Sequence, residues 1–292
     1  MNDVLEIALA GCLHDVGKLF QRAGTGLTDP ARRMEPMLCP TDEAGYGTHR
    51  HVLWTNDFIE RYLAWLPPSV DRARLNDIAS SHHRPSEPLH WLVAEADRLA
   101  SGHDRRPAEQ ESDGGYCHVP LSSILAGLAL QRGPVAAPPW YGPAHDLSVC
   151  VSPRSDVPPP DLRPEYARVA DAMIADMATW PRVPEAVLCG CLASLSARYL
   201  AMNPASTVDM PDTSLHDHNM LVAAFAAALF QYHKRTDSLR EPAIRDRASR
   251  KFRLVCGDLS GIQKFIFAPA PEGLRKGIAR TFRARSFYLS ML

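Results

Sequence analysis

Apolar residues near the N-terminus recur at three- and four-residue steps. They are Val4, Leu5, Ala8, Leu9, Cys12, Val16 and Leu19. This spacing predicts an amphipathic helix over residues 3–20 that packs on a core. His14 and Asp15 lie inside the run, and consecutive helical residues diverge by roughly 100°. The two side chains therefore cannot chelate as one clamp, but each can reach a different point of a shared cavity.

The same periodicity predicts a mainly α-helical chain. Further helices are expected over residues 48–63, 69–80, 89–101, 121–130, 164–177, 184–202 and 213–234. The helix over 89–101 has a capping serine at Ser86 and a proline, Pro88, in its first turn. Within it, Asp97 lies beside the apolar face, whereas Glu95 points nearer to solvent.

Segments rich in proline, glycine and charge separate these helices. Residues 21–48 and 102–164 are expected to be irregular surface insertions, apart from the short helix at 121–130. Residues 241–250 are dense in charged side chains and are expected to be a linker or an exposed helix. These boundaries predict one helical domain over residues 1–240.

The composition changes after residue 250. Residues 252–256 predict a buried strand, and residues 260–267 predict a helix directly behind it. One strand and two helices cannot close a sheet, so residues 251–292 are expected to open a second domain that this chain leaves incomplete. The basic run over 275–285 could face RNA or a neighbouring subunit, or could be a solvated helix face.

The overall composition is that of a folded globular protein. The 292 residues are 46% hydrophobic, which suits one large domain or two ordinary ones. A net charge of -1 provides no bulk attraction to nucleic acid, so such binding needs a local patch. The seven cysteines form no paired CxxC pattern and are expected to be reduced, as in a cytoplasmic protein. No apolar stretch is long enough to predict a membrane span.

Histidine and aspartate side chains gather on several of the predicted helices. The candidates are His14, Asp15, His49 or His51, His82, His83, Asp97 and His218. Imidazoles and carboxylates without thiolates suit a hydrolytic site for Mn, Fe, Co, Ni or Mg better than a structural zinc site. Two such ions a few ångströms apart can hold the attacking and leaving oxygens of a phosphodiester.

Several of these residues also have ordinary structural explanations. His49 stands near a helix terminus, where a histidine is commonly a cap or a surface residue. His218 heads an apolar stripe and could be a satisfied core histidine. Lys18 could cap its own helix or contact a phosphate. The adjacent His82 and His83, just past a helix end, are less easily explained by packing.

In combination, these motifs resemble one known family. The matching segments are residues 14–18 (HDVGK), His51 with Thr55, Ser81-His82-His83, residues 95–99 (EADRL) and residues 211–218 (PDTSLHDH). Their order resembles the permuted HD-nuclease domain at the N-terminus of the large subunit of type III CRISPR interference complexes. The Csm (subtype III-A) branch is the most similar. Residues 257–265 (GDLSGIQKF) and 283–289 (RARSFYL) resemble the opening of that family's first palm domain.

The resemblance implies a permuted HD helical bundle followed by the start of a ferredoxin-like α/β palm. It implies two divalent ions, Mn, Ni, Co or Mg. One ion would be held by His14, Asp15, Asp97 and His218, and the other by Asp15, His51, His82 and His83. The catalytic residues would be His14, Asp15 and Lys18, with Asp15 bridging the ions. One side of an ATP pocket would be formed by Gly257, Asp258 and Ser260.

The resemblance also implies an activity and partners. In this family, target RNA activates the cleavage of single-stranded DNA, and a pair of palms makes cyclic oligoadenylate from ATP. The second palm, with its Gly-Gly-Asp-Asp motif, is not in this chain, so cyclic oligoadenylate synthesis would require a second palm. Expected partners are the small subunit, the guide-RNA-binding subunits, guide RNA, target RNA and single-stranded DNA. The alternatives are an HD phosphohydrolase acting on free nucleotides and a non-catalytic scaffold subunit.

Overall fold

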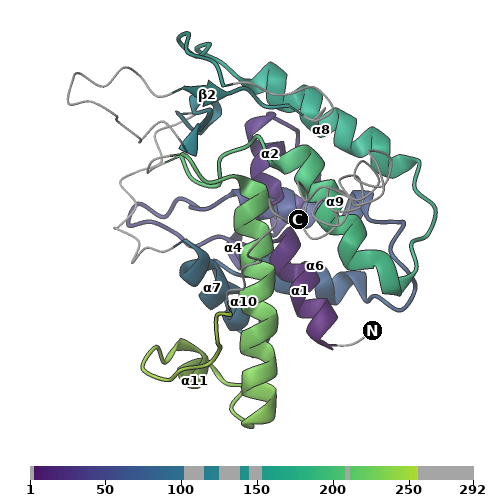
Figure 1. The fold of residues 1–292 in the computed structure, drawn as a ribbon, viewed down its shortest axis with the longest axis vertical. Coiled ribbons are helices and arrows are strands. Elements are labelled where there is room, and N and C mark those ends of the chain that lie inside the picture. Colours follow the sequence, from purple (N-terminus) through teal and green to yellow (C-terminus); the bar gives the residue numbers. More distant parts are fainter. Residues whose placement is uncertain (1–2, 102–114, 125–138, 145–152, 208–210, 256–292) are drawn as a thin grey trace, which may run out of the picture. The chain divides into compact units, whose positions relative to one another are not determined.

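The computed structural model of the chain describes residues 3–101, 115–124, 139–144, 153–207 and 211–255. Contacts divide the chain into two units, Met1–Phe252 and Arg253–Leu292. The first unit is mainly helical, as the sequence predicts (Figure 1). Within the described ranges, no helix combines the length and the apolar character that crossing a membrane requires.

Helices make up most of the first unit. The α-helices are α1 (Asp3–Leu13), α2 (Gly17–Arg22), α3 (Asp29–Arg33), α4 (Glu35–Leu38), α5 (His51–Tyr62), α6 (Arg72–Ser80), α7 (Pro88–Ala100), α8 (Arg163–Ala178), α9 (Leu188–Leu200), α10 (Leu215–Arg235) and α11 (Glu241–Arg245). Two 3-10 helices are η1 (Gly115–His118) and η3 (Glu185–Val187). The strands β1 (Leu121–Ser122) and β2 (Trp140–Tyr141) pair antiparallel, with Leu121 opposite Tyr141.

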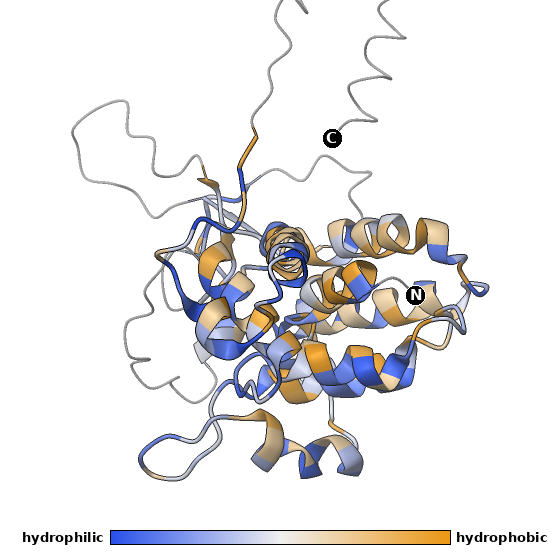
Figure 2. Cartoon of the chain, turned by 90° about the horizontal axis from the view of Figure 1, so that it is seen from below, coloured by the Kyte–Doolittle hydropathy of each residue, from blue (hydrophilic) through white to orange (hydrophobic). Residues whose placement is uncertain are grey.

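Helix α1 lies at the centre of the core. It packs on α10, α6 and α7, while α2 packs on α5 and α8. Figure 1 shows the long α10 running beside α1, and Figure 2 shows that the helices carry both hydrophobic and hydrophilic residues, as amphipathic helices do. Gly11 permits the close approach of α1 to α10, because a Cβ atom there would lie 2.8 Å from the Cα atom of Ala223.

The prediction of one continuous helix over residues 3–20 is wrong, because α1 ends at Leu13 and α2 begins at Gly17. The hydroxyl of Thr55 on α5 donates to the carbonyl oxygen of His14 (2.9 Å) and accepts from the amide of Gly17 (3.1 Å). A continuous helix would pair these backbone groups within itself. A contact from a distant helix therefore produces the turn that carries the first motif.

The composition predicts that residues 21–48 are irregular throughout. This prediction is wrong for part of the segment. Helices α3 and α4 occupy part of this segment. Ala31 and Leu38 are buried in a small cluster with Val52 and Leu53 of α5. The insertion thus forms a second, smaller core with the first turn of α5.

The helix predicted over residues 121–130 is wrong where the structure describes it. Leu121 and Ser122 form β1, and residues 125–130 lie outside the described residues. The partner strand contains Trp140, which is buried and whose indole N–H donates to the carbonyl oxygen of Asp156 (2.7 Å). Part of the insertion over 102–164 is therefore ordered by pairing between distant residues, which periodicity does not reveal.

Residues 241–250, expected to be a linker or an exposed helix, contain α11, which packs on α7. Ile244 of α11 is fully buried. The ammonium of Lys251 donates to the carbonyl oxygens of Ala243 and Ile244 at 2.7 Å each, which satisfies the end of this short helix. These contacts keep the segment with the first unit.

The buried strand predicted over residues 252–256 is not formed by residues 252–255. The side chains of Phe252, Leu254 and Val255 are exposed. A strand needs a hydrogen-bonded neighbour, and none of the described residues pairs with this segment. Residues 256–292, on which the rest of the expected palm falls, lie outside the described residues.

Candidate metal centre

The carboxylate of Asp15 is the centre of the candidate site. Asp15 lies in the turn between α1 and α2, which Thr55 holds in place. Imidazoles and a second carboxylate reach it from the end of α1, the start of α5, the turn after α6, and helices α7 and α10. They form two groups, His14 with Asp15, Asp97 and His218, and Asp15 with His51, His82 and His83. Within each group the candidate ligand atoms all lie within 4.8 Å of one another.

Asp15 presents a different carboxylate oxygen to each group. Its Oδ2 lies 3.4 Å from Nε2 of His14 and 3.5 Å from Nε2 of His218. Its Oδ1 lies 2.9 Å from Nε2 of His51 and 3.6 Å from Nε2 of His82. One side chain is therefore placed between the two groups, as a bridging carboxylate would be.

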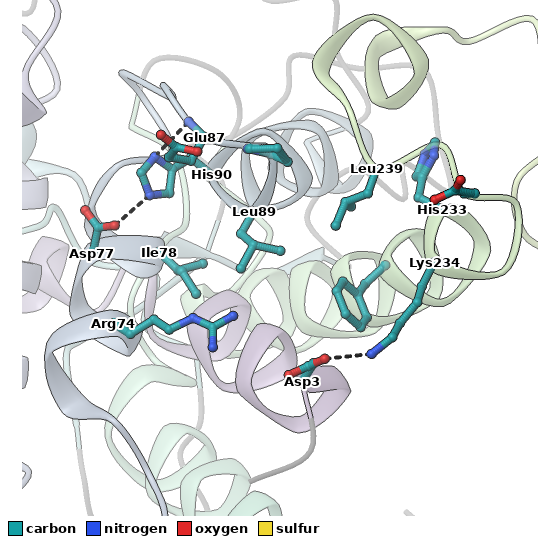
Figure 3. A pocket seen from close by; sticks show the side chains of 13 residues that line it. Asp3, Arg74, Asp77, Ile78, Glu87, Leu89, His90, His233, Lys234 and Leu239 are labelled. Carbon is teal, nitrogen blue, oxygen red and sulfur yellow. Dashed lines mark hydrogen bonds and ion pairs between the residues drawn. The ribbon is translucent and has the colours of Figure 1, made fainter.

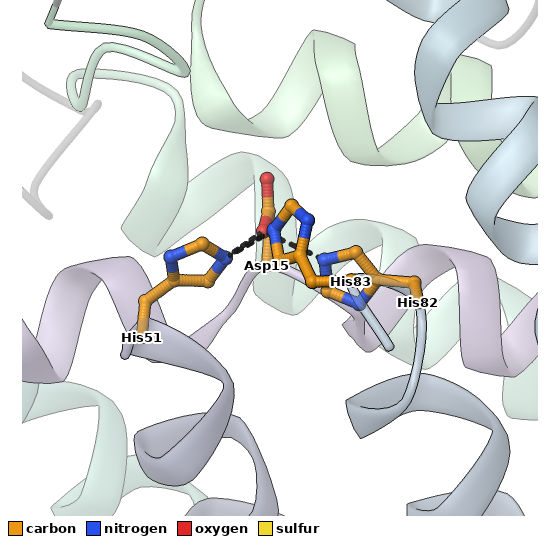
Figure 4. A group of neighbouring side chains, drawn as sticks. All are labelled: Asp15, His51, His82 and His83. Carbon is orange, nitrogen blue, oxygen red and sulfur yellow. Dashed lines mark hydrogen bonds and ion pairs between the residues drawn. The ribbon is translucent and has the colours of Figure 1, made fainter. Parts of the chain in front are cut away.

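The remaining members complete each group. In the first, Oδ1 of Asp97 lies 3.2 Å from Nε2 of His218 and 3.9 Å from Nε2 of His14. In the second, Nε2 of His83 lies 3.1 Å from Nε2 of His51. Figure 4 shows the three imidazoles of the second group converging on Asp15.

Backbone carbonyl groups fix the orientation of two of these rings. Nδ1 of His14 lies 2.7 Å from the carbonyl oxygen of Gly11, and Nδ1 of His82 lies 2.9 Å from that of Ala79. A carbonyl oxygen can only accept, so Nδ1 carries the proton and donates in both cases. In the neutral form of each ring, Nε2 carries the lone pair, and this atom faces the group. A histidine that binds a metal is commonly held in this way.

Buried polar atoms without hydrogen-bond partners provide the test of whether these residues suit a metal ion. Nε2 of His14, His82 and His218 and Oδ1 of Asp15 are all buried and have no hydrogen-bond partner. Such atoms are rare in proteins because each is costly. Four of them facing one another, all of types that bind divalent cations, fit a metal centre and are hard to explain by packing.

The carboxylate of Asp15 is held in its ionised form. Burial alone would raise its pKa, but the ammonium of Lys18 and the imidazoles of His14 and His51 outweigh burial and hold the pKa well below its usual range. An ionised carboxylate is the form that binds a metal.

Burial governs two of the imidazoles. It lowers the pKa of His14, and it lowers the pKa of His51 to about 3 against the influence of Asp15. For His218, burial also opposes the charged form, but contacts with the carboxylates of Asp15 and Asp97 outweigh it and raise the pKa. His14 and His51 are thus neutral near pH 7, as metal ligands must be.

Lys18 lies beside Asp15 rather than at the end of its helix. Its ammonium donates to Oδ2 of Asp15 (2.6 Å) and to the carbonyl oxygen of Ala205 (2.9 Å). It therefore provides a positive charge next to the shared carboxylate, in a position from which it could also meet a bound anion.

The structure separates the two alternatives at the start of α5. His51 belongs to the second group, whereas His49 does not belong to either. His49 adopts a positive φ of 54° just before α5, and its ring lies 4.1 Å from that of His83 between centroids. His49 therefore borders the site through a neighbouring ring.

Sequence reasoning missed the structural role of Thr55 and the burial of Glu95. Thr55 is fully buried and ties the Asp15 turn to α5, and its position one turn after His51 was the available signal. Glu95, expected near solvent, is buried and pairs with Arg247, which follows α11. That pairing could not be read from the helical pattern of α7 alone.

A cavity of about 480 Å³ lies away from the two ligand groups, between α1, α6, α7 and the end of α10 (Figure 3). An ion pair between Lys234 and Asp3 (2.6 Å) and a hydrogen bond between His90 and Asp77 (2.9 Å) border it. It shares no residue with either ligand group. The predicted nucleotide-contacting residues Gly257, Asp258 and Ser260 lie outside the described residues.

Comparison with known proteins gives matches along the whole chain. A relative from Mycobacterium tuberculosis, named CRISPR system single-strand-specific deoxyribonuclease Cas10/Csm1 (subtype III-A), is 30% identical and matches 100% of this chain and 37% of its own length. A relative of the same name from Thermococcus onnurineus is 27% identical, over 98% of this chain and 34% of its own length. The chain thus spans about a third of the length of these relatives.

Two further comparisons agree with these matches. A family model described as Csm1 subunit domain B matches residues 251–292. The crystal structure of a Csm1–Csm4 cassette in complex with cA4 has a similar fold, with a TM-score of 0.52 and 17% identity over 80% of this chain and 28% of that chain. Relatives named Cas10/Csm1 of subtype III-A therefore match this chain from end to end, and the domain model and the fold agree with that similarity.

Proposed function

We propose that this chain forms the metal-dependent nuclease part of the large subunit of a type III-A CRISPR effector, and that it cleaves single-stranded DNA. The observation that carries the proposal is the placement of the two Asp15 oxygens, one in each group of buried ligand atoms. The relatives named single-strand-specific deoxyribonucleases supply the substrate class. Target RNA would activate the cleavage.

The two groups would hold two divalent ions, Mn, Ni, Co or Mg, with Asp15 shared between them. Such ions, when bound, polarise a phosphodiester and stabilise the charge that develops on its oxygens. The chain contributes the positioning. His14 and His82 are locked by backbone carbonyls, so that little rearrangement of the rings is needed when ligands bind. His14 and Asp15 would be catalytic as members of this centre.

Lys18 is the remaining catalytic candidate. Its ammonium donates to Asp15, and its side chain is partly exposed. A cation at this place can steady a phosphate oxygen of the DNA backbone without itself binding the metal. Lys18 would thus act on the substrate, while the histidines and carboxylates act on the ions.

Residues 251–292 would begin the first palm domain, with 1–240 as the HD-type nuclease domain and 241–250 as the connection. The match to Csm1 subunit domain B supports this assignment. Gly257, Asp258 and Ser260 would then contribute one side of an ATP pocket, and cyclic oligoadenylate synthesis would require a second palm. The related cassette bound to cA4 supports this second activity for the family.

The proposed partners are those of such an effector. The similar Csm1–Csm4 cassette supports contacts with other subunits of the complex. These would include the small subunit and the subunits that bind guide RNA. Guide RNA and target RNA would reach the chain through that assembly, and single-stranded DNA would be the substrate.

Cleavage of end-labelled single-stranded DNA in Mn²⁺ tests the proposal. The parent chain is compared with the double variant His14→Ala/Asp15→Ala, and double-stranded DNA and mononucleotides serve as parallel substrates. We expect cleavage of single strands by the parent and none by the variant. Turnover of mononucleotides without strand cleavage would instead indicate a phosphohydrolase of free nucleotides. No metal-dependent difference on any substrate would indicate a scaffold role and contradict the proposal.

A further inference from the structure

Glu95 is a buried carboxylate on α7, the helix that also carries Asp97. Its side chain is only 4% exposed, although it bears a charge. Nε of Arg247 donates to its Oε1 (2.7 Å), and Nη1 of Arg98 donates to its Oε2 (3.4 Å). Each oxygen of this buried group therefore has a guanidinium partner.

Arg247 reaches Glu95 from a distant part of the chain. It follows α11, and 152 positions separate it from Glu95. Helix α11 is fixed on α7 by the buried side chain of Ile244, and its last carbonyls are bound by Lys251. The segment that holds Arg247 is therefore fixed on α7, and it places the guanidinium beside Glu95. The match to Csm1 subunit domain B begins four positions later, at residue 251.

The two carboxylates of α7 lie on opposite faces of the helix. Positions 95 and 97 differ by roughly 200° around a helical axis. Asp97 accordingly faces His14 and His218, while Glu95 faces Arg247. A metal-binding carboxylate must be placed within about 0.5 Å to be effective. Without Arg247, the buried carboxylate would keep the longer contact with Arg98 (3.4 Å) but lose its 2.7 Å partner. The weakened pairing would draw Glu95 toward water and turn α7.

We infer that the ion pair between Arg247 and Glu95 positions the carboxylate of Asp97 in the metal centre. Both are positioning residues, because they contact Asp97 only through the helix that they hold. The inference rests on the proposed function, since it concerns the same metal centre. It gives the segment around α11, which precedes the match to Csm1 subunit domain B, an indirect role in placing one ligand of the proposed metal centre.

Mn²⁺ binding to the metal-free chain, measured by calorimetry and electron paramagnetic resonance, tests the inference. The variant Asp97→Asn first identifies the ion that depends on Asp97. We expect Arg247→Gln and Glu95→Gln each to lower the affinity for that same ion about tenfold. Substitutions of residues that support a metal ligand typically have effects of this size. The ion held by His51, His82 and His83 should keep its affinity within about twofold. A general loss of stability would not produce this selectivity.

Two control variants accompany the measurement. Arg168→Gln removes an exposed guanidinium that pairs with Glu165 on α8 (3.4 Å), and it should bind as the parent does. Arg247→Lys keeps a positive charge at the pair and should recover most of the lost affinity. Circular dichroism verifies folding, and Glu95→Gln carries the test alone if Arg247→Gln does not fold.

The possible failures are distinguishable. Parent affinities for both ions in the folded Arg247→Gln and Glu95→Gln variants would overturn the inference and leave the metal centre standing. Equal weakening of both ions would also overturn it, because the pair would then support only the fold. A parent chain that binds no Mn²⁺ would remove both the inference and the proposed function.

Discussion

Asp15 is the one residue that belongs to both groups of candidate ligands. Its two oxygens face different sets of imidazoles, and Lys18 beside it keeps the carboxylate ionised despite full burial. Other members of the site each serve one group. We therefore expect a substitution at Asp15 to affect the binding of both ions. A substitution at a residue that belongs to one group should affect the binding of one ion.

We expect Asp15→Asn to abolish binding of both ions, because an amide is neutral and offers only one oxygen. Mn²⁺ affinity should fall by more than about a hundredfold at each site. Calorimetric titration measures this, with Asp97→Asn as the matched control that should affect one ion. Retention of one ion at parent affinity in Asp15→Asn would contradict the bridging role.

The metal-free chain should lose stability as the pH falls from 6.5 toward 3. The pKa of His51 drops from 6.5 to about 3 on folding, so within this window the unfolded chain binds a proton that the folded chain does not. The free energy of unfolding should therefore fall with falling pH, by up to about 1.4 kcal/mol per pH unit from this residue. Urea denaturation of parent and His51→Gln chains at several pH values measures the difference. Equal pH slopes for the two chains would show that His51 ionises as readily when folded.

Helix boundaries at the site depend on contacts between elements as well as on local pattern. The helical period of residues 3–20 is continuous, yet the hydroxyl of Thr55 intercepts two backbone groups and breaks the helix. Glu95 was misassigned for a related reason, because its partner Arg247 lies 152 positions later in the chain. Local periodicity therefore located the helices that bear the candidate ligands, but it did not reveal these tertiary contacts.

Thr55→Val should destabilise the chain by about 2–4 kcal/mol, because it leaves a buried carbonyl and a buried amide without partners. Valine has nearly the same shape, so packing is preserved. Chemical denaturation measures the change. Thr236→Val, at an exposed hydroxyl at the end of α10, serves as control and should change stability by less than about 0.5 kcal/mol. A loss at Thr55 no larger than that at Thr236 would argue against its role in the turn.

Gly17→Ala should also destabilise the turn, by about 1–3 kcal/mol, because the added Cβ would collide with backbone atoms of His51 and Thr55. Gly190→Ala is the matched control. It lies in α9 with open space around it, and alanine should stabilise that helix by about 0.5–1 kcal/mol. Thermal denaturation measures both changes, with a lower melting temperature expected for Gly17→Ala and a higher one for Gly190→Ala. A neutral Gly17→Ala would mean that α2 can move away from α5 at little cost.

At the scale of the whole molecule, the sequence indicated a mainly helical chain. It also indicated which histidines and aspartates the fold brings together as candidate ligands. His14, Asp97 and His218 come from three different helices or their ends, far apart in the sequence, and with Asp15 they form one group of candidate ligands. What the sequence did not reveal depends on distant pairing. Strand β1 forms only because Trp140 and Tyr141 lie beside it, and residues 252–255 form no strand because none of the described residues pairs with them.

The similarity to proteins named Cas10/Csm1 extends along the whole chain, and the geometry of the first unit brings the candidate ligands together. The chain spans about a third of the length of its relatives, so the partners and the second activity belong to the proposal. The candidate ligands of the proposed metal centre, in contrast, all belong to the first unit. A measurement on this chain can therefore address the centre without the remainder of the complex.

The most direct test is anomalous diffraction from crystals of the chain soaked in Mn²⁺, recorded at the manganese absorption edge. The account predicts two anomalous peaks on either side of the Asp15 carboxylate, one among His14, Asp97 and His218 and the other among His51, His82 and His83. Crystals of Asp15→Asn should lose both peaks. Peaks elsewhere, or none near Asp15 in the parent chain, would contradict the metal centre on which the proposed nuclease depends.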